Sequence, residues 1–455
     1  MDKATPPGPG AAMTTPGATA GPSPGMTLGA RDAIAITVGI VVGAGIFRTP
    51  SLVAGAASSE AMVYLAWIAG GLISIVGALC YAELASAFPS AGGDYHFLKR
   101  AFGGRLAFLY GWARLSVIQT GSVALLAFVF GDYASQIVSL GPYSPALYAA
   151  GCVIAITAVQ WIGVRAGAGV QVWLTLAEIA GLTAVIVAGL LVAPAAAPQI
   201  VTSDSGAFGL MMVFVLLTFG GWNEAAYVSA ELKDARRRMA PVLLFSLGLI
   251  TVLYLLVNAA YLRALGLAGV AGSQAVAADV MQLAFGPLGA GLISAFVAVA
   301  ALTSANATVF TGARTAWALG RDHPRLAIFG RWDEASGSPR NGLIVQGAAA
   351  LALVILGAFA RDGFQLAVDY TAPVFWSFFL LVGVALFRLR HTEPDAERPF
   401  RVPLYPVLPA LFVLTNAYLL YSSLAYTGRG ALLGLAILAL GGLLMIPLQK
   451  KETPP

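Results

Sequence analysis

Two glycine clusters interrupt apolar stretches of this sequence, and both are placed where a backbone could bind a ligand. One is GIVVGAGIF at residues 39–47, and the other is FGGWNE at residues 219–224. Glycine allows a helix to unwind, and unwound backbone inside a bilayer exposes N–H and C=O groups that lipid cannot satisfy. The N-terminus of a half-helix attracts a carboxylate, and freed carbonyls accept bonds from an ammonium group or a cation. A zwitterionic amino acid carries both groups on one carbon, so two broken helices side by side suit it. The alternative is that the glycines only permit close helix packing.

A glutamate, Glu178, lies inside another apolar run, LTLAEIAG at residues 174–181. An ionisable side chain at the bilayer centre costs roughly 2.5–3.5 kcal/mol, so it is by default a candidate for function. Its carboxyl group could exchange a proton, or complete a cation site with Thr303 and Ser304 of a later run. The first interpretation predicts that Glu178 couples substrate movement to protons. The structural alternative is a protonated glutamate held by a neighbouring helix.

Three further charged residues, Glu83, Arg114 and Glu224, are assigned to a pathway or gate. Glu224 directly follows the second glycine cluster, where it would cap a free backbone group, line the pathway or bind a basic substrate; we favour the first two roles. Glu83 and Arg114 fall near the same side of the membrane, so a salt link between them would stabilise an inner gate. Equally, Arg114 would extend its guanidinium towards the interface. Asp132 and Asp369 are expected near interfaces and are assigned no chemistry.

Composition places these residues in a membrane protein. The 455-residue chain is 58% hydrophobic and only 10% charged, with a mean hydropathy of +0.82. A soluble domain carries about 25% charged residues. Residues 1–27 lack the basic start and apolar core of a signal peptide and are predicted to be a disordered tail. Neither the two cysteines nor the three histidines have the setting or spacing of a metal site, so no metal and no cofactor are expected.

Apolar runs long enough to cross a bilayer recur about twelve times. The spans are predicted at residues 31–56, 62–88, 106–138, 146–163, 169–193, 207–230, 240–264, 280–317, 341–360, 364–388, 403–427 and 430–448. With a cytoplasmic N-terminus, 21 of the 26 Lys and Arg residues fall inside, four including Arg48 fall outside, and Arg114 lies within a span. This bias predicts that both termini are cytoplasmic, in the plasma (cell inner) membrane. It also explains the net charge of +5 by topology and contact with anionic lipid, so no nucleic acid partner is expected.

The spans fall into two sets of five followed by a pair. We predict a first repeat at residues 28–195, a second at 206–390, helices 11 and 12 at 403–448, and a cytoplasmic tail at 449–455. Because five is odd, the second repeat enters the membrane from the opposite side and is inverted. Each repeat begins with a glycine-interrupted helix, and matched interruptions of this kind indicate a transporter site.

Four motifs follow one another in the chain: GAGIF at 43–47, YAEL at 81–84 with PSAGGDY at 89–95, FGGWN at 219–223, and ELKD at 231–234. In this order they resemble the amino acid–polyamine–organocation superfamily of permeases, nearest the branch of L-type amino acid transporters and their bacterial relatives. The resemblance covers residues 28–448. It implies an all-α polytopic protein with the leucine-transporter fold, a 5+5 inverted repeat in which helices 1 and 6 are broken.

The resemblance also implies a substrate site. The substrate carboxylate would lie on the backbone amides of Ala44, Gly45 and Ile46. The ammonium would meet carbonyls near Val41, Leu217 and Gly220. The full implied set is Val41, Gly43, Ala44, Gly45, Ile46, Leu217, Phe219, Gly220, Gly221 and Trp222.

Three positions depart from the pattern of the family. Ala44 stands where relatives often have serine, and Leu217 where they often have a large aromatic gate. Glu178 stands where they often carry a lysine whose ammonium replaces a sodium ion. These departures affect substrate preference and coupling.

We therefore predict a secondary active transporter of amino acids, most of all neutral ones, working by alternating access with proton coupling or exchange. Protons rank ahead of sodium, and the chain is expected to be a monomer or homodimer. A same-fold carrier of cationic amino acids or polyamines is the alternative, and a channel is more remote. An intramembrane enzyme would need a buried His-Glu-x-x-His or a serine with His or Lys, so no enzyme is expected.

Overall fold

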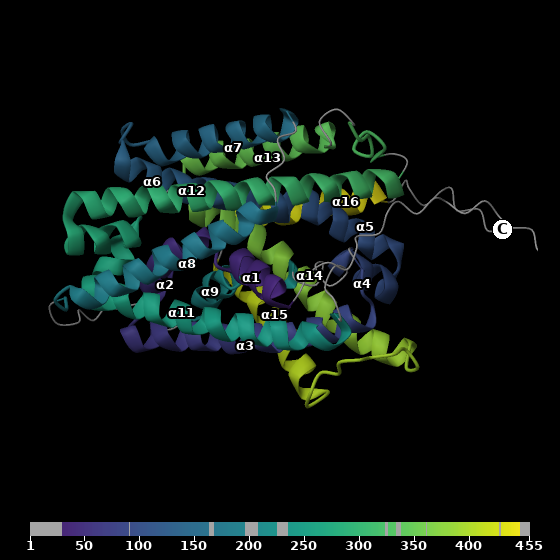
Figure 1. Ribbon diagram of the computed structural model, residues 1–455. Helices are drawn as coiled ribbons and strands as arrows, with labels where there is room; N and C mark the ends of the chain where they lie inside the picture. Colours follow the sequence, from purple (N-terminus) through teal and green to yellow (C-terminus); the bar gives the residue numbers. More distant parts are fainter. Residues whose placement is uncertain are drawn as a thin grey trace, which may run out of the picture.

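The protein is a bundle of helices (Figure 1). The computed structural model describes residues 30–90, 92–162, 168–195, 208–224, 235–323, 326–333, 338–360, 362–426 and 429–445. In these ranges the β structure consists of one isolated bridge between Asp333 and Ser338. The predicted tails at 1–27 and 449–455, and the ELKD motif at 231–234, lie outside them.

The helices follow one another along the whole described chain. In order they are α1 (Ala30–Val41), η1 (Ala44–Phe47), α2 (Thr49–Ala56), α3 (Glu60–Ala87), α4 (Gly93–Phe102), α5 (Gly104–Ala113), η2 (Arg114–Ile118), α6 (Gln119–Ile137), α7 (Ser144–Ile162), α8 (Ala168–Leu191), α9 (Phe208–Thr218), η3 (Trp222–Glu224), α11 (Ala235–Gly272), α12 (Val276–Asp322), α13 (Arg340–Ala358), α14 (Gly363–Thr392), α15 (Val407–Tyr426) and α16 (Arg429–Met445).

This arrangement confirms an all-α polytopic membrane fold. Within the described residues, eight helices are long and apolar enough to cross a membrane, and three shorter apolar segments lie at Leu176–Leu191, Phe208–Thr218 and Gly430–Met445. With the broken first span, α1 to α2, they account for the twelve predicted spans. The short helix α4 was not predicted. The division of the chain into two inverted halves remains a prediction.

The third and eighth spans are long in the structure, as the predicted ranges 106–138 and 280–317 are. The third is continuous from Gly104 to Ile137 through α5, η2 and α6. The eighth, α12, has 47 residues and is kinked at Gly286, whose backbone is not helical (φ 67°, ψ −161°). At about 1.5 Å per residue, both exceed the roughly 30 Å of hydrocarbon. The turn η2 is a π-helix within the third span, a feature often found at functional positions.

Glycines on α3 seat the helices around the second interruption. A Cβ at Gly70 would lie 2.3 Å from Val215, and one at Gly77 would lie 2.7 Å from Trp222. Real Cβ atoms do not approach other heavy atoms so closely, so α3 meets the sixth span only because these residues lack side chains. Figure 1 shows α1 near the middle of the bundle, where it contacts α8 and α11.

Candidate functional site

The first predicted interruption is present. Helix α1 ends at Val41, Gly43 is extended (φ −91°, ψ −178°), and the chain resumes as the single turn η1. The first N–H groups of a helix have no acceptor within it, and Gly43 brings no side chain to cap them. Gly43 and Gly45 are half-buried between buried neighbours, so this stretch of backbone remains partly accessible.

The second interruption is also present. Helix α9 ends at Thr218, and the chain turns through Phe219, Gly220 and Gly221 into η3. Gly221 has φ +104°, a left-handed conformation that glycine adopts without strain. The Gly220 amide donates to the Leu217 carbonyl at 3.0 Å, which uses part of that carbonyl's capacity. The chain beyond Glu224, up to residue 234, lies outside the described residues.

The two interruptions lie against each other. A Cβ at Gly45 would meet the Thr218 side chain at 3.5 Å. The hydroxyls of Thr218 and Thr49 are hydrogen-bonded at 2.8 Å, which joins the end of α9 to the start of α2. The backbone groups of the two breaks are thus neighbours, as a shared receptor for a carboxylate and an ammonium requires.

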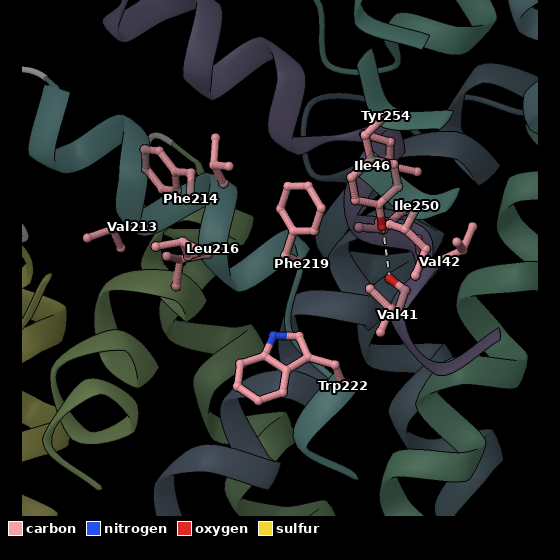
Figure 2. Close-up of a cluster of buried hydrophobic side chains, with 14 of the residues drawn as sticks. Val41, Val42, Ile46, Val213, Phe214, Leu216, Phe219, Trp222, Ile250 and Tyr254 are labelled. Atoms are coloured by element: carbon pink, nitrogen blue, oxygen red, sulfur yellow. Dashed lines mark hydrogen bonds between the residues drawn. The ribbon is translucent and has the colours of Figure 1, made fainter. Parts of the chain in front are cut away.

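Tyr254 of α11 holds both breaks, and sequence reasoning missed it. Its hydroxyl donates to the Val41 carbonyl at 2.9 Å, as Figure 2 shows, and lies 3.4 Å from the Thr218 carbonyl. The Val41 carbonyl also accepts from the Gly43 amide at 2.7 Å. A carbonyl oxygen has two lone pairs, so both of Val41's are occupied in this conformation. In sequence, Tyr254 looks like any aromatic residue of an apolar span.

Phe219 and Trp222 are buried in different aromatic groups. The Phe219 ring packs on Tyr254 and Trp67, with centroid distances of 5.1 and 6.0 Å. The Trp222 ring packs on Tyr81 at 5.1 Å, and Figure 2 shows it directed away from Phe219. These two side chains anchor the break from both sides, whereas Leu217, Gly220 and Gly221 are half-buried.

Glu178 is buried on α8, with 4% of its surface exposed, and its Oε2 atom has no hydrogen-bond partner in the described part of the chain. Gly181, one turn further along α8, faces Phe296 of α12. On α12, the Thr303 hydroxyl donates to the Ala300 carbonyl, and the Ser304 carbonyl accepts from Thr308. Among the described residues no hydrogen bond joins Glu178 to Thr303 or Ser304, so a shared cation site remains a prediction.

The expected link between Glu83 and Arg114 is wrong, because each has another ionic partner. Glu83 accepts two hydrogen bonds from Arg390, at 2.7 and 2.5 Å. Arg114 donates to both carboxylate oxygens of Glu224, at 2.9 and 3.1 Å. Arg114 therefore does not extend alone to an interface. Neither pair could be predicted from the sequence, because the partners are 307 and 110 positions apart along the chain.

A buried ionic group beside the first break was also missed. Arg48, directly after η1, donates to Asp132 of α6 at 3.2 Å and to Asp362, the N-cap residue of α14. It also contacts Ser51 and the Ser273 carbonyl. Only 4% of Arg48 is exposed. From the sequence, Arg48 was expected on the outer side of the membrane and Asp132 near an interface with no chemistry, because the hydropathy pattern does not show which charged residues meet.

The chain matches known transporters over nearly its whole length. Residues 28–444 match the family model described as "Amino acid permease". The chain is 30% identical over 404 residues to the b(0,+)-type amino acid transporter 1 of Mus musculus, covering 86% of this chain and 81% of that protein. It is 29% identical over 428 residues to the large neutral amino acids transporter small subunit 2 of Oryctolagus cuniculus, covering 91% and 78%. The chain belongs to the amino acid permease family and is a transporter of amino acids rather than an enzyme.

Proposed function

We propose that the protein carries neutral amino acids by alternating access, with the substrate bound between the two helix breaks. The observation that carries this proposal is the direct contact of the breaks through Gly45, Thr218 and Thr49. It brings uncapped amides and partly accessible carbonyls of two helices together. Such a pair recognises the carboxylate and ammonium that all amino acids share.

In this arrangement the carboxylate lies on the amides of Ala44, Gly45 and Ile46. The ammonium binds carbonyls near Gly220, Leu217 and Val41. Because both lone pairs of the Val41 carbonyl are engaged, an ammonium there has to replace the Tyr254 hydroxyl. Substrate binding and movement of α11 against the first break would then be linked.

Coupling to protons is assigned to Glu178. The burial of Glu178, and the lack of a hydrogen-bond partner for its Oε2 atom among the described residues, support a carboxyl group that gains and loses a proton during the cycle. Thr303 and Ser304 are half-buried and belong to α12, which packs on α8. A variant Glu178→Gln should abolish concentrative uptake driven by a pH gradient while leaving exchange intact. Full concentrative uptake with unchanged pH dependence would remove Glu178 from the coupling role.

Neutral side chains are favoured over cationic ones because the acidic group beside the second break, Glu224, is already paired with Arg114. One relative is named for large neutral amino acids. A cationic amino acid remains the second candidate, since the carboxylate of Glu224 is near enough to the break to bind it if Arg114 moves. We further propose a plasma membrane location with cytoplasmic termini, and a monomer or homodimer.

The test is uptake into proteoliposomes of the purified full chain, using a panel of neutral, cationic and anionic amino acids. The measurement is made with and without a pH gradient and with and without internal substrate. Saturable uptake of neutral amino acids is expected, with counterflow if the cycle permits exchange. A protein that is folded but takes up no amino acid in a saturable manner would contradict the proposal.

A further inference from the structure

Arg114 and Glu224 form a salt bridge within the helix bundle. One guanidinium nitrogen, Nη2, lies 2.9 and 3.1 Å from the two carboxylate oxygens. The exposures of the two side chains differ: 7% for Arg114 and 32% for Glu224. The carboxylate is therefore the accessible member of the pair, and the guanidinium is the buried one.

Arg114 is fixed by its surroundings. It is the first residue of η2, the π-helical turn that interrupts the third span. Its Nη1 atom donates to the Tyr110 hydroxyl at 3.2 Å, and that hydroxyl donates to Asp94 of α4 at 3.0 Å. This chain of contacts aims the guanidinium at η3. A planar group with fixed donors suits such a position better than a flexible ammonium.

Glu224 is as accessible as the half-buried residues of the second break, and we call these residues together the accessible strip. Leu217, Gly220, Gly221 and Glu224 are half-buried, whereas Phe219 and Trp222 between them are buried. The element that carries Glu224, η3, contacts α1, whose last residue is Val41. Within residues 208–224 Glu224 is the sole charged residue. Whether its charge is neutralised therefore decides which substrate side chains, cationic or neutral, this segment attracts.

We propose that the Arg114–Glu224 pair sets the charge selectivity of the permease for substrate side chains; this inference rests on the proposed function. Paired, the two side chains have no net charge, and a cationic substrate would have to displace a held guanidinium. Without Arg114, the carboxylate faces the pathway and attracts a cationic side chain. Without Glu224, the guanidinium attracts an anionic one. The two single changes should therefore shift selectivity in opposite directions.

The test uses competition for leucine uptake by arginine and by glutamate in proteoliposomes. For each protein, the inhibition constant of arginine is divided by that of a neutral amino acid used as a second competitor. In Arg114→Gln this ratio should fall at least about tenfold, because the negative charge of Glu224 then has no counter-charge within a few ångströms. In Glu224→Gln, the corresponding ratio for glutamate should fall. The double variant Arg114→Gln/Glu224→Gln should return both ratios to within about twofold of the parent protein. A purely structural role would lower stability and uptake but would not shift the two ratios in opposite directions.

Each outcome bears on the proposal. If leucine uptake persists in both single variants and both ratios are unchanged, the proposed role of the pair in charge selectivity is overturned, while the proposed function remains intact. Folded, unmodified protein that takes up neither leucine nor any other amino acid in a saturable manner would instead contradict the proposed function. If Arg114→Gln does not fold, as judged by thermal unfolding in detergent, Arg114→Lys supplies the test. Its single ammonium holds Glu224 less firmly, so the arginine ratio should shift in the same direction by a smaller factor. An unchanged ratio in that variant would overturn the proposal.

Discussion

The two ends of the bundle are held together in different ways. Helix α14 runs from one end to the other: Asp362 caps its start, and Arg390 stands in its last turn. At the first end, as far as the described residues show, one guanidinium, that of Arg48, joins α6 and α14, and it directly adjoins the first break. At the second end, several separate pairs join the helices, including Glu83 with Arg390 and Arg100 with Glu393.

This difference indicates how each end would open. Removing one residue, Arg48, would leave two carboxylates without their cation, so the first end should open as a unit with the adjoining break. At the second end, the pairs differ in burial, from Glu83 at 1% exposed to Arg100 at 41%. Loss of any one pair leaves the others, so that end should loosen in steps.

The largest effect is expected from Arg48→Ala. Asp132 and Asp362 would lose their shared cation in a buried site, which typically costs 3–5 kcal/mol, here about 4 kcal/mol. Thermal or denaturant unfolding in detergent measures the loss. Adding Asp132→Asn to Arg48→Ala should recover part of it, because one unpaired charge is then removed. A loss for Arg48→Ala no larger than for an exposed arginine would contradict the difference between the ends.

A smaller effect is expected from Glu83→Gln. The carboxylate accepts from Arg390 and from the Val402 amide at 2.7 Å, and Arg398 lies 3.6 Å away. Glutamine keeps one acceptor for the amide but leaves Arg390 without its counter-charge. We expect a loss of roughly 2–3 kcal/mol, within the range for hydrogen bonds to charged groups. The amide hydrogens in the last turn of α14 should also exchange several-fold faster in this variant. Unchanged exchange rates in α14 would refute the role of the Glu83–Arg390 pair in holding this helix.

The second end should also respond to pH through Asp94 of α4, a ten-residue helix that is too short to span the membrane. Burial raises the pKa of Asp94 to about 6, with Arg114 acting in the opposite direction. In the unfolded chain the pKa of an aspartate is about 3.9. The folded protein therefore keeps the proton of Asp94 to a higher pH than the unfolded chain does. The ionised form is the less stable one in the fold, so stability from this group should fall as pH rises from about 4 to 6 and stay low above.

Asp94→Asn should remove that part of the pH dependence, an effect of roughly 1–3 kcal/mol over this range. Unfolding midpoints of the variant and the parent protein, measured at several pH values, give the comparison. Identical slopes for the two proteins between pH 4 and 6 would show that Asp94 does not titrate there.

The smallest effect is expected from Arg100→Ala, the counterpart of Arg48→Ala at the second end. Arg100 contacts Glu393 through three hydrogen bonds, but both side chains are substantially exposed. Exposed ion pairs contribute about 0–1 kcal/mol, and salt weakens them. We expect a change below about 1 kcal/mol that shrinks further in high salt. A loss as large as that of Arg48→Ala would mean that the second end also depends on one residue.

The sequence predicted the spans and both breaks because these depend on local composition. Long apolar runs and the clusters around Gly43 and Gly220 are visible in a few adjacent residues. It did not predict the partners of Arg48, Arg114 and Glu83, because those contacts join residues 84 to 314 positions apart. Hydropathy predicts whether a residue lies within a membrane span, but it does not predict which other helix packs against that residue.

Tyr254 illustrates the same limit at the site itself. Its residue type and setting predict only a buried aromatic side chain. The three-dimensional packing of α11 against α1 is what places its hydroxyl on the Val41 carbonyl. The short helix α4 was missed for another reason: it is amphipathic and polar enough to look like a connection.

The most direct test of the site is an experimental structure of the protein with a bound neutral amino acid such as leucine. We predict that the α-carboxylate lies within hydrogen-bond distance of the amides of Ala44, Gly45 and Ile46, with the ammonium near the Gly220 and Leu217 carbonyls and the Tyr254 hydroxyl displaced from Val41. Leucine bound elsewhere in the bundle, with both breaks unchanged and empty, would contradict the account.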